Sequence, residues 1–451
     1  MKKFIETVKN IWSIEELRNK ILITLSFMVI YRFAAQVTLP GLDGSVIADS
    51  LNSNSGGAGG ILDMINMFTG GGFSRASVMA LGVMPYISAS IVVQLMGIAI
   101  PYLQKLKKDG ESGNKKITQI TRWLTIGITL VQGPAYIASL PSLGIPAEAF
   151  IMGQGNTLFW ITSLVLLTTG SIFAMWLGEK ITDKGIGNGI SLLIMIGIIA
   201  GFPSAFAQEF ASKTTNGGAG GIMMILIEII VWFAVILACV YLVTAIRKVA
   251  LQYARKTVAG TVTDVAGSRQ YIPLKLNAAG VMPIIFAQAI MFVPSALVTA
   301  DFTSEGVKSV AAMFADFSGV GYNVLFATLI IIFSFFYTAI TVPTNEMAAS
   351  IKRSGGFIPG IRPGKETDNY LDRILSLITF PGSIFLALLA ILPAFVIKFG
   401  VQQSWSMFYG GTSLLIMVGV AIDTIQQINS HLLNRHYDGL MKTGTKRKSV
   451  A

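Results

Sequence analysis

The 451-residue chain is 53% apolar and only 13% charged, whereas soluble globular proteins carry about 25% charged residues. This composition excludes an ordinary soluble domain and predicts one integral membrane body, because apolar segments follow one another along the whole chain. The formal net charge is +11, and the single cysteine, Cys239, excludes a disulfide framework within the chain and a thiolate metal site.

Apolar windows predict ten membrane-spanning helices, since a helix needs about 20 residues to cross the apolar core. Charged residues are frequent in the stretch 1–20, and no small-residue cleavage site follows the first window. We therefore expect this window to be a retained span and not a signal peptide. In chain order, the predicted spans are residues 21–37, 77–100, 117–140, 158–177, 190–206, 222–245, 276–297, 322–342, 375–397 and 407–425.

Residues 60–68, between the first two spans, form an apolar segment too short to cross a membrane. Three glycines at 70–72 follow it, and non-helical backbone at membrane depth persists only where protein or a water-filled cavity satisfies it. The segment is therefore predicted to be re-entrant, which makes conduction the first hypothesis; an interfacial helix on the outer leaflet is the alternative. Apolar side chains at helical spacing give it an amphipathic face, made of Ile61, Met64, Ile65 and Phe68.

Basic residues predict that both termini lie in the cytoplasm. With the N-terminus inside, the outer loops hold only four of the 34 Lys and Arg residues, which are Arg75, Lys213, Lys308 and Lys398. Such an excess of basic residues on one side marks the cytoplasmic face.

Two of the cytoplasmic loops, 247–275 and 341–375, are longer than the usual helix connection of about 2–8 residues. Two interpretations of their charges stay open. The charges set the topology and touch anionic lipid headgroups, or the loops form a docking platform for a large anionic partner such as ribosomal RNA.

Cofactor and metal motifs are not supported, and we expect no cofactor. One glycine-rich motif resembles a dinucleotide-binding loop: Gly185-Ile-Gly-Asn-Gly-Ile-Ser. It follows a membrane span, however, and not the strand that such a loop requires. Gly364-Lys365 lacks the Ser or Thr that a phosphate-binding loop needs next. The two histidines, His431 and His436, are expected to be a surface pair and not a metal site.

The charges inside the predicted spans include Arg32, Glu228 and Asp423. Ionisable residues there are functional candidates by default, because they are costly to bury. Their positions near helix ends favour snorkelling or structural pairing instead. Since no nucleophile has a base nearby in the sequence, we expect no catalytic residues and no enzyme activity.

Four motifs along the chain resemble those of the SecY family, the channel-forming subunits of Sec protein translocases. The motifs are Ala80-Leu-Gly-Val-Met-Pro-Tyr-Ile-Ser-Ala-Ser-Ile, the Gly185 motif, Pro273-Leu-Lys-Leu-Asn-Ala-Ala-Gly-Val-Met-Pro, and Gly356-Phe-Ile-Pro-Gly-Ile-Arg-Pro-Gly. The span count, the cytoplasmic termini and the re-entrant segment agree with that family.

The resemblance implies an all-α fold of ten transmembrane helices in two pseudo-symmetric inverted halves of five, with a re-entrant plug helix at 60–68. It places the N-terminal half at 1–206, a glycine-rich hinge loop at 207–221, the C-terminal half at 222–430 and a basic cytoplasmic tail at 431–451. No convincing sequence repeat between the halves is evident, although the span count permits the inverted arrangement.

The resemblance also implies three channel sites. A hydrophobic pore ring consists of Val83, Ile87, Ile190, Ile194, Ile285 and Ile416; stiff side chains of this kind would close around a polypeptide and offer ions no polar partner. The plug packs beneath this ring. A lateral gate between the second and seventh spans carries the polar residues Ser88, Gln132 and Asn277, whose hydrogen bonds are weak enough for a hydrophobic signal helix to open.

The function implied is a passive protein-conducting channel in the plasma (inner) membrane, through which unfolded secretory polypeptides pass and from which signal sequences leave sideways into lipid. The expected partners are small membrane subunits similar to SecE and SecG, and either the SecA ATPase or a translating ribosome. Contact residues for the motor or ribosome are Arg362, Arg353, Arg255 and Lys256; Pro and Gly neighbours would hold Arg362 on an exposed turn.

Two other classes of function remain. A secondary transporter also uses broken helices, but it needs a polar site at the midplane, which these spans hardly offer. A non-conducting scaffold for membrane assembly explains the basic loops but leaves the re-entrant segment without a purpose.

Overall fold

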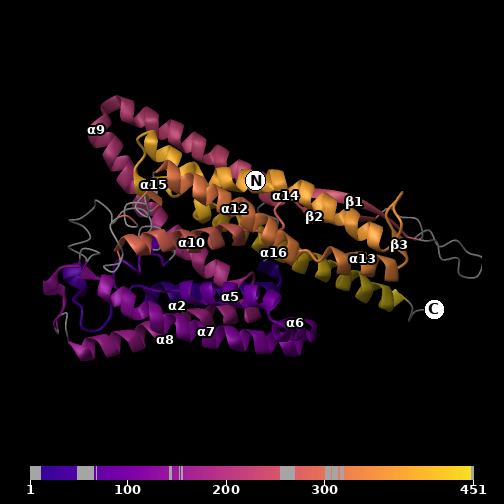
Figure 1. Cartoon of the computed structure of the whole chain (residues 1–451), viewed down its shortest axis with the longest axis horizontal. Coiled ribbons are helices and arrows are strands. Elements are labelled where there is room, and N and C mark those ends of the chain that lie inside the picture. Colours follow the sequence, from indigo (N-terminus) through magenta and orange to yellow (C-terminus); the bar gives the residue numbers. More distant parts are fainter. Residues whose placement is uncertain are drawn as a thin grey trace, which may run out of the picture. The chain divides into compact units, whose positions relative to one another are not determined.

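The structure is a computed structural model that describes residues 12–47, 66–67, 69–141, 145–151, 153, 156–253, 270–299, 306, 313–314 and 319–447. Contacts divide the chain into two compact units (Figure 1). The first unit contains residues 1–207 and 420–451, and the second contains residues 208–419.

Helices occupy all ten predicted span positions. Among the described residues, six helices are long and apolar enough to cross a membrane, or seven if the pair Met84–Gly97 and Pro101–Lys107, bent by 101°, counts as one broken span. Helices α2 (Glu15–Ala34), α7 (Gly110–Ser139) and α10 (Met282–Thr299) lie at the remaining three predicted positions.

The first unit is built from α2, α5 (Met84–Ala99), α6 (Pro101–Lys108), α7, α8 (Thr157–Lys184), the start of α9 (Gly189–Thr244) and the end of α16 (Gly411–Arg447). Helix α7 packs against both α5 and α8, and α2 packs against α8. A short 3-10 helix, Ala147–Ala149, lies beside a buried core that includes Leu39, Phe73, Leu140, Phe159 and Leu167.

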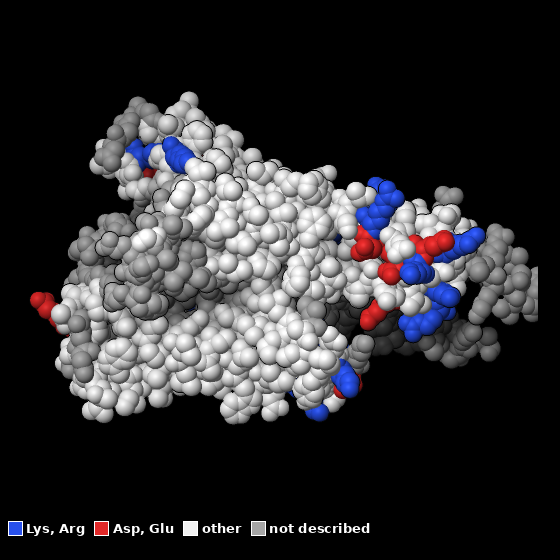
Figure 2. Space-filling model, in the orientation of Figure 1, with Lys and Arg blue, Asp and Glu red and all other residues white. Residues whose placement is uncertain are grey.

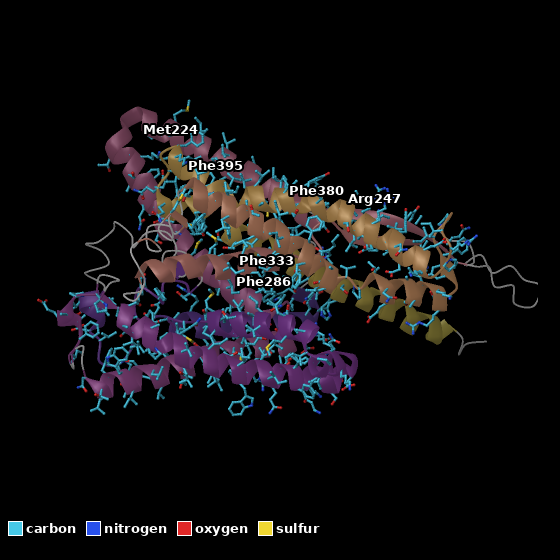
Figure 3. The ribbon with its side chains drawn as sticks, in the orientation of Figure 1. Met224, Arg247, Phe286, Phe333, Phe380 and Phe395 are labelled. Atoms are coloured by element: carbon cyan, nitrogen blue, oxygen red, sulfur yellow. The ribbon has the colours of Figure 1, made fainter. Side chains whose placement is uncertain are left out.

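The second unit holds the rest of α9, strands β1 (Ile246–Tyr253) and β2 (Gln270–Lys275), α10, α12 (Val320–Thr341), α13 (Thr344–Arg353), β3 (Gly356–Phe357), α14 (Lys365–Lys398), α15 (Gln403–Ser406) and the start of α16. Helix α12 packs against α10 and α14. Phe286 on α10 stacks on Phe333 of α12, with ring centroids 5.6 Å apart (Figure 3). Apolar side chains such as Met224, Phe380 and Phe395 point outward, about half exposed, as a lipid-facing surface requires.

The two long loops of the second unit fold together as one small subdomain, which the sequence did not predict. Strand β1 pairs antiparallel with β2 on one side and with the two-residue β3 on the other, so the strand order is β2-β1-β3. Val249 lies opposite Ile272, and Tyr253 lies opposite Gly356. Beneath the sheet, α13 and the start of α14 contribute to a separate core of Val249, Leu251, Leu274, Ile351, Ile358, Leu371 and Leu375.

The second and seventh predicted spans start six or more residues later than their apolar windows. Helix α5 begins at Met84 and not at residue 77, and α10 begins at Met282 and not at residue 276. In each case the helix follows a glycine with positive φ, Gly82 (50°) or Gly280 (64°), and has a proline in its first turn, where the missing N–H costs nothing.

These two starts share the sequence Gly-Val-Met-Pro, at 82–85 and 280–283. The two helix starts therefore share one local signal, a glycine with positive φ followed by a proline in the first turn.

The predicted loop at 207–221 is mostly helical. Helix α9 contains two apolar spans, Gly189–Thr215 and Gly221–Thr244, and folds back on itself between them (Figure 1). The reversal is tight: a Cβ on Gly221 would lie 2.1 Å from the carbonyl oxygen of Lys213. A turn this close requires glycine at position 221.

Candidate functional site

The predicted ring residues lie at or near the starts of helices. Val83 precedes α5 and is buried, and Ile87 follows one turn later, its N–H donating to the Val83 carbonyl over 3.0 Å. Ile190 and Ile194 stand one turn apart at the start of α9. These four residues belong to the first unit.

The other two ring residues belong to the second unit. Ile285 lies in the first turn of α10, and Ile416 lies in the second turn of α16, buried. All six positions are thus helical or immediately before a helix, while the closed ring stays a prediction. The predicted plug residues Ile61, Met64, Ile65 and Phe68 lie outside the described residues.

The three predicted gate residues occupy different surroundings. Ser88 is half-buried on α5, and Gln132 is exposed on α7, which packs against α5. Asn277 lies in the turn between β2 and α10. Its Oδ1 atom is buried and accepts no hydrogen bond within the described part of the chain. An unpaired buried amide oxygen is costly, so this position favours a partner.

Arg362, the main predicted contact residue, is exposed on a fixed turn. Gly360 and Gly364 flank it with φ values of 85° and 117°. Its carbonyl accepts a hydrogen bond of 2.9 Å from the Thr367 hydroxyl, and Thr367 is buried in the first turn of α14. The backbone is therefore held in place while the side chain is exposed.

Arg353 is exposed in the last turn of α13, whereas Arg255 and Lys256 lie outside the described residues. Figure 2 shows Lys, Arg, Asp and Glu side chains gathered at the α13 and β3 end of the second unit, next to an uncharged surface. The exposed cations there are Arg247, Lys248, Lys275, Lys352, Arg353, Arg362, Lys365 and Arg373.

The glycine motif at 185–189 is a junction of helices. The backbone N–H of Ile186 donates to the Thr24 hydroxyl on α2 over 3.1 Å. That of Gly187 donates to Gln427 Oε1 on α16 over 2.8 Å, and that of Gly189 donates to Thr182 on α8 over 2.9 Å. These amides already have partners, so they do not form a phosphate cradle; the motif ties three helices to the start of α9.

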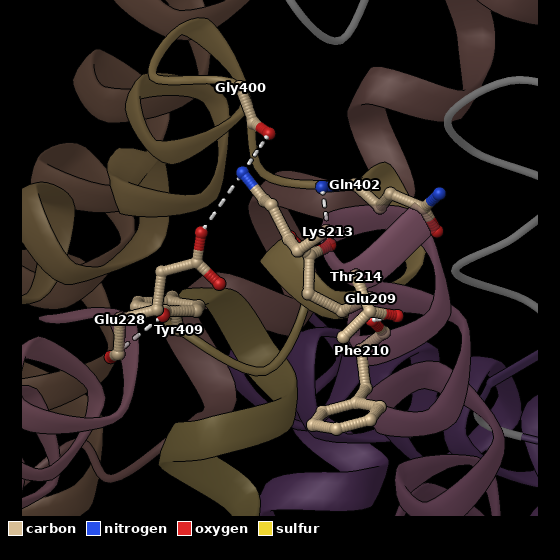
Figure 4. A network of polar contacts seen from close by, with 8 residues as sticks. All are labelled: Glu209, Phe210, Lys213, Thr214, Glu228, Gly400, Gln402 and Tyr409. Carbon is tan, nitrogen blue, oxygen red and sulfur yellow. Dashed lines mark hydrogen bonds and ion pairs between the residues drawn. The ribbon is translucent and has the colours of Figure 1, made fainter. Parts of the chain in front are cut away.

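A charged network in the second unit accounts for Glu228. Lys213 Nζ lies 3.3 Å from Glu228 Oε1 and 3.6 Å from Glu209 Oε1, and it donates to the Gly400 carbonyl over 2.8 Å (Figure 4). The side chains of Glu209, Lys213 and Glu228 are only 2, 15 and 11% exposed. Structural pairing, which the sequence favoured for Glu228, is therefore what the structure shows.

The same network joins the α9 hairpin to the chain around α15. Glu209 Oε2 accepts the Gln402 N–H over 2.8 Å, and the Tyr409 hydroxyl donates to the Glu228 carbonyl over 2.8 Å (Figure 4). Lys213 was expected in an exposed outer loop, and Glu209 was not singled out. The glycines that follow them in the sequence suggested a loop, although both residues are helical.

An ion pair between the third predicted span and the residues just after the fourth also escaped the sequence analysis. Arg122 on α7 donates to Glu179 on α8 through two nitrogens, at 3.1 Å from Nε and 2.5 Å from Nη2. Two parallel bonds of this kind are among the stronger charge pairs. The signal was present in the sequence, because Arg122 lies within the third apolar window. The other two charges differ: Arg32 is half-buried and donates to the Gly70 carbonyl over 2.9 Å, while Asp423 is exposed on α16.

Comparison with known proteins relates these features to one family. A family model described as SecY matches residues 77–425. The chain belongs to the SecY family. A SecY protein translocase subunit of Streptomyces scabiei is 39% identical over 436 residues, which cover 95% of this chain and 97% of the relative. The corresponding subunit of Chlamydia muridarum is 37% identical over 452 residues, covering 97% of this chain and 98% of the relative.

Solved structures place the chain in the same fold. A structure described as a protein-conducting channel has a TM-score of 0.60 at 18% identity and covers 92% of both chains. Sec61 in the canine ribosome-channel complex has a TM-score of 0.56 at 17% identity, again covering 92% of both chains. The SecY fold is an all-α, ten-helix, pseudo-symmetric membrane fold, as the sequence predicted.

We predict that Lys213→Met destabilises the protein by about 3–5 kcal/mol, because it leaves the two buried carboxylates of Glu209 and Glu228 without their cation. Thermal unfolding of the purified protein in detergent measures this. The matched control is Lys398→Met, which removes an exposed lysine at the end of α14. Equal melting temperatures for the two variants would contradict a stabilising network.

Proposed function

We propose that this chain is the channel-forming subunit of a Sec protein translocase. It conducts unfolded secretory polypeptides across the plasma membrane and releases hydrophobic segments sideways into lipid. The observation that carries the proposal is membership of the SecY family over nearly the whole chain, together with the channel fold. The protein is a channel subunit and not an enzyme, so the energy for transport comes from a partner.

The apolar ring explains how such a channel conducts a polypeptide and still resists leakage. Val83, Ile87, Ile190, Ile194, Ile285 and Ile416 form the constriction in this proposal, and the plug segment at 60–68 seals it from the outer side. Isoleucine and valine offer ions and water no polar partner, and their branched side chains hold few conformations. The ring residues lie at or near the first turns of their helices, which supports the proposal. A small movement of these helix ends would widen the ring.

The lateral gate sorts segments by hydrophobicity. Ser88, Gln132 and Asn277 supply polar contacts between helices that are weak, about 0.6–2 kcal/mol each, compared with the transfer of a whole signal helix into lipid. Asn277 Oδ1 accepts no hydrogen bond among the described residues. This supports a role for Asn277 in contacting a polar group of a partner or substrate.

The sheet subdomain is the proposed cytoplasmic docking platform. Its exposed cations, Arg362 and Arg353 among them, suit an anionic or acidic partner, and Arg255 and Lys256 extend the same loop. Two relatives of this fold are the Sec61 channel in a canine ribosome complex and the yeast Ssh1 complex on the 80S ribosome. For this chain we propose the SecA ATPase and the ribosome as partners at this platform, and small SecE-like and SecG-like subunits within the membrane.

The orientation and the domain boundaries follow from the same proposal. The excess of Lys and Arg supports a cytoplasmic position for both termini and the platform. The functional halves are 1–206 and 222–430, joined at 207–221 and followed by the basic tail 431–451; the tight α9 hairpin supports a short hinge. A secondary transporter fits less well, because Glu179, Glu209 and Glu228 face cations of the chain itself and not an open midplane site.

The ring predicts a change in signal selectivity. Ile285→Asn or Ile416→Asn places an amide among apolar neighbours and weakens the closed state by about 1–3 kcal/mol. Export of substrates with defective signal sequences should then increase. Ile290→Asn, at an exposed position on the same helix as Ile285, serves as the control. Unchanged selectivity in both ring variants would remove these residues from the ring.

The gate predicts a shifted threshold for membrane insertion. Replacing Gln132 or Asn277 with Leu removes a polar contact and changes how hydrophobic a segment must be before it enters lipid. A graded series of signal sequences measures the displacement. A uniform loss of the protein from the membrane would instead indicate a role in folding.

If Arg362 contacts a partner at the platform, we expect the contact to depend on the shape of its guanidinium group as well as on its positive charge. Arg362→Glu should abolish motor-driven translocation and Arg362→Lys should impair it, because lysine cannot reproduce a planar, forked donor. Channel in liposomes with SecA, ATP and a model preprotein measures the rate. Lys107→Glu, an exposed residue near the end of α6, should be tolerated. Equal activity of Arg362→Glu and the unmodified protein would exclude the contact.

A further inference from the structure

Residues 69–83 form a compact stem that joins the plug segment to α5. The stem is a series of turns stabilised by its own hydrogen bonds. The Phe73 N–H donates to the Thr69 hydroxyl over 3.1 Å, and the Ser77 N–H donates to the Gly72 carbonyl over 3.0 Å. At the end nearest the plug, Asn66 Oδ1 accepts the Ser74 N–H over 3.1 Å. Displacement of the plug segment therefore pulls on a structured element and not on a free loop.

The two ends of the stem are held in different ways. The end nearest α5 pairs with the backbone after α2, with bonds of 2.9 Å from the Val78 N–H to the Val37 carbonyl and from the Leu39 N–H to the Ala76 carbonyl. In the middle, the Tyr136 hydroxyl on α7 donates to the Phe73 carbonyl over 2.7 Å. The end nearest the plug receives the bond from Arg32 Nη1 on α2 to the Gly70 carbonyl, at 2.9 Å.

The contact with Arg32 requires glycine at position 70. Its φ is +66°, and a Cβ built on it would lie 2.2 Å from Arg32 Nη1 and 3.0 Å from the Cα of Gly197 on α9. The neighbouring Gly71 also has positive φ, +88°, but the nearest atom to its Cβ would be Arg75 Nε at 3.9 Å. The stem is thus pressed between α2 and α9 at Gly70 and is open one residue later.

Snorkelling alone does not explain Arg32. Its guanidinium keeps its charge at any physiological pH, and it lies in the last turn of α2, where a cation suits the helix dipole. Both effects are satisfied by a side chain that extends into water. The side chain instead turns to a backbone carbonyl 38 residues away in the sequence, at the point where the stem meets the plug segment.

We propose that Arg32 is a positioning residue that latches the plug-proximal end of the stem onto α2 and so favours the closed channel. The inference rests on the proposed channel function. Opening breaks the bond between Arg32 and Gly70 and lets the stem turn about its other end, which the backbone pairing with Val37 and Leu39 keeps in place.

Ion leak through purified channel complex in liposomes tests the latch. Arg32→Met removes the donor, and Gly70→Ala pushes the guanidinium away while it keeps the charge. Each should raise the resting leak by about tenfold or more, the factor expected for the loss of one hydrogen bond to a charged group. Arg32→Lys retains a donor and should leak less than Arg32→Met.

Two matched controls separate the bond from its surroundings. Gly71→Ala carries the same backbone strain as Gly70→Ala without touching Arg32, and Arg75→Met removes an exposed positive charge from the stem; both should leak as little as the unmodified channel. If Gly71→Ala leaks as much as Gly70→Ala, or Arg75→Met as much as Arg32→Met, the latch is excluded. Because a Cβ on Gly70 also approaches the Cα of Gly197, the Gly70 and Gly71 pair does not decide alone. If Arg32→Met does not fold, Arg32→Gln should leak more than Arg75→Gln, and equal leak of these two variants would exclude the latch.

The ring variant Ile285→Asn distinguishes failure of this inference from failure of the channel function. Leak through Ile285→Asn with none through Gly70→Ala or Arg32→Met would overturn the latch and leave the channel in place. No leak through any variant, with no preprotein transport by the unmodified complex, would overturn the channel function and the latch with it.

Discussion

A backbone polar group without a partner is so costly in hydrocarbon that every non-helical segment at membrane depth must find one inside the protein. The stem before α5 and the glycine junction before α9 both meet this requirement. In the stem, turns and the side chains of Thr69, Arg32 and Tyr136 supply the partners. In the junction, three helices supply them. A channel of this kind needs breaks in its helices. These hydrogen bonds stabilise the backbone at the breaks.

The ten spans were predictable because hydropathy depends on composition over a long window, and no element has to be placed against another. The first residues of α5 and α10 were not predictable from hydropathy. An apolar turn and an apolar helix have the same hydropathy. Only Gly82 and Gly280, with positive φ, and the prolines that follow mark the change. The resemblance named the ring residues, five of which lie on helices while Val83 precedes α5. The ring stays a prediction, because its closure depends on how two units meet, which no local pattern encodes.

Long-range contacts explain the remaining differences. Strand β3 has two residues, and its pairing with β1 joins Gln252 to Phe357, so neither a period-2 pattern nor a turn signal was available. Lys213 and Glu228 lie close only because the chain reverses between them. Glu228 was identified as exceptional, but its partner Lys213 was visible only in three dimensions. Glu179, Glu209 and Glu228 each face a basic side chain of the same unit.

The strand order of the small sheet has a consequence for biosynthesis. Its central strand, β1, is made soon after the sixth span, yet β3 follows the eighth span and α13. A nascent chain that has not reached residue 357 can form only the β1 and β2 hairpin, with one edge of β1 unpaired. The finished edge and the helical core beneath it therefore appear only when the intervening spans have been synthesised. A partner that recognises the completed sheet would engage chains that extend past residue 357 and pass over shorter ones.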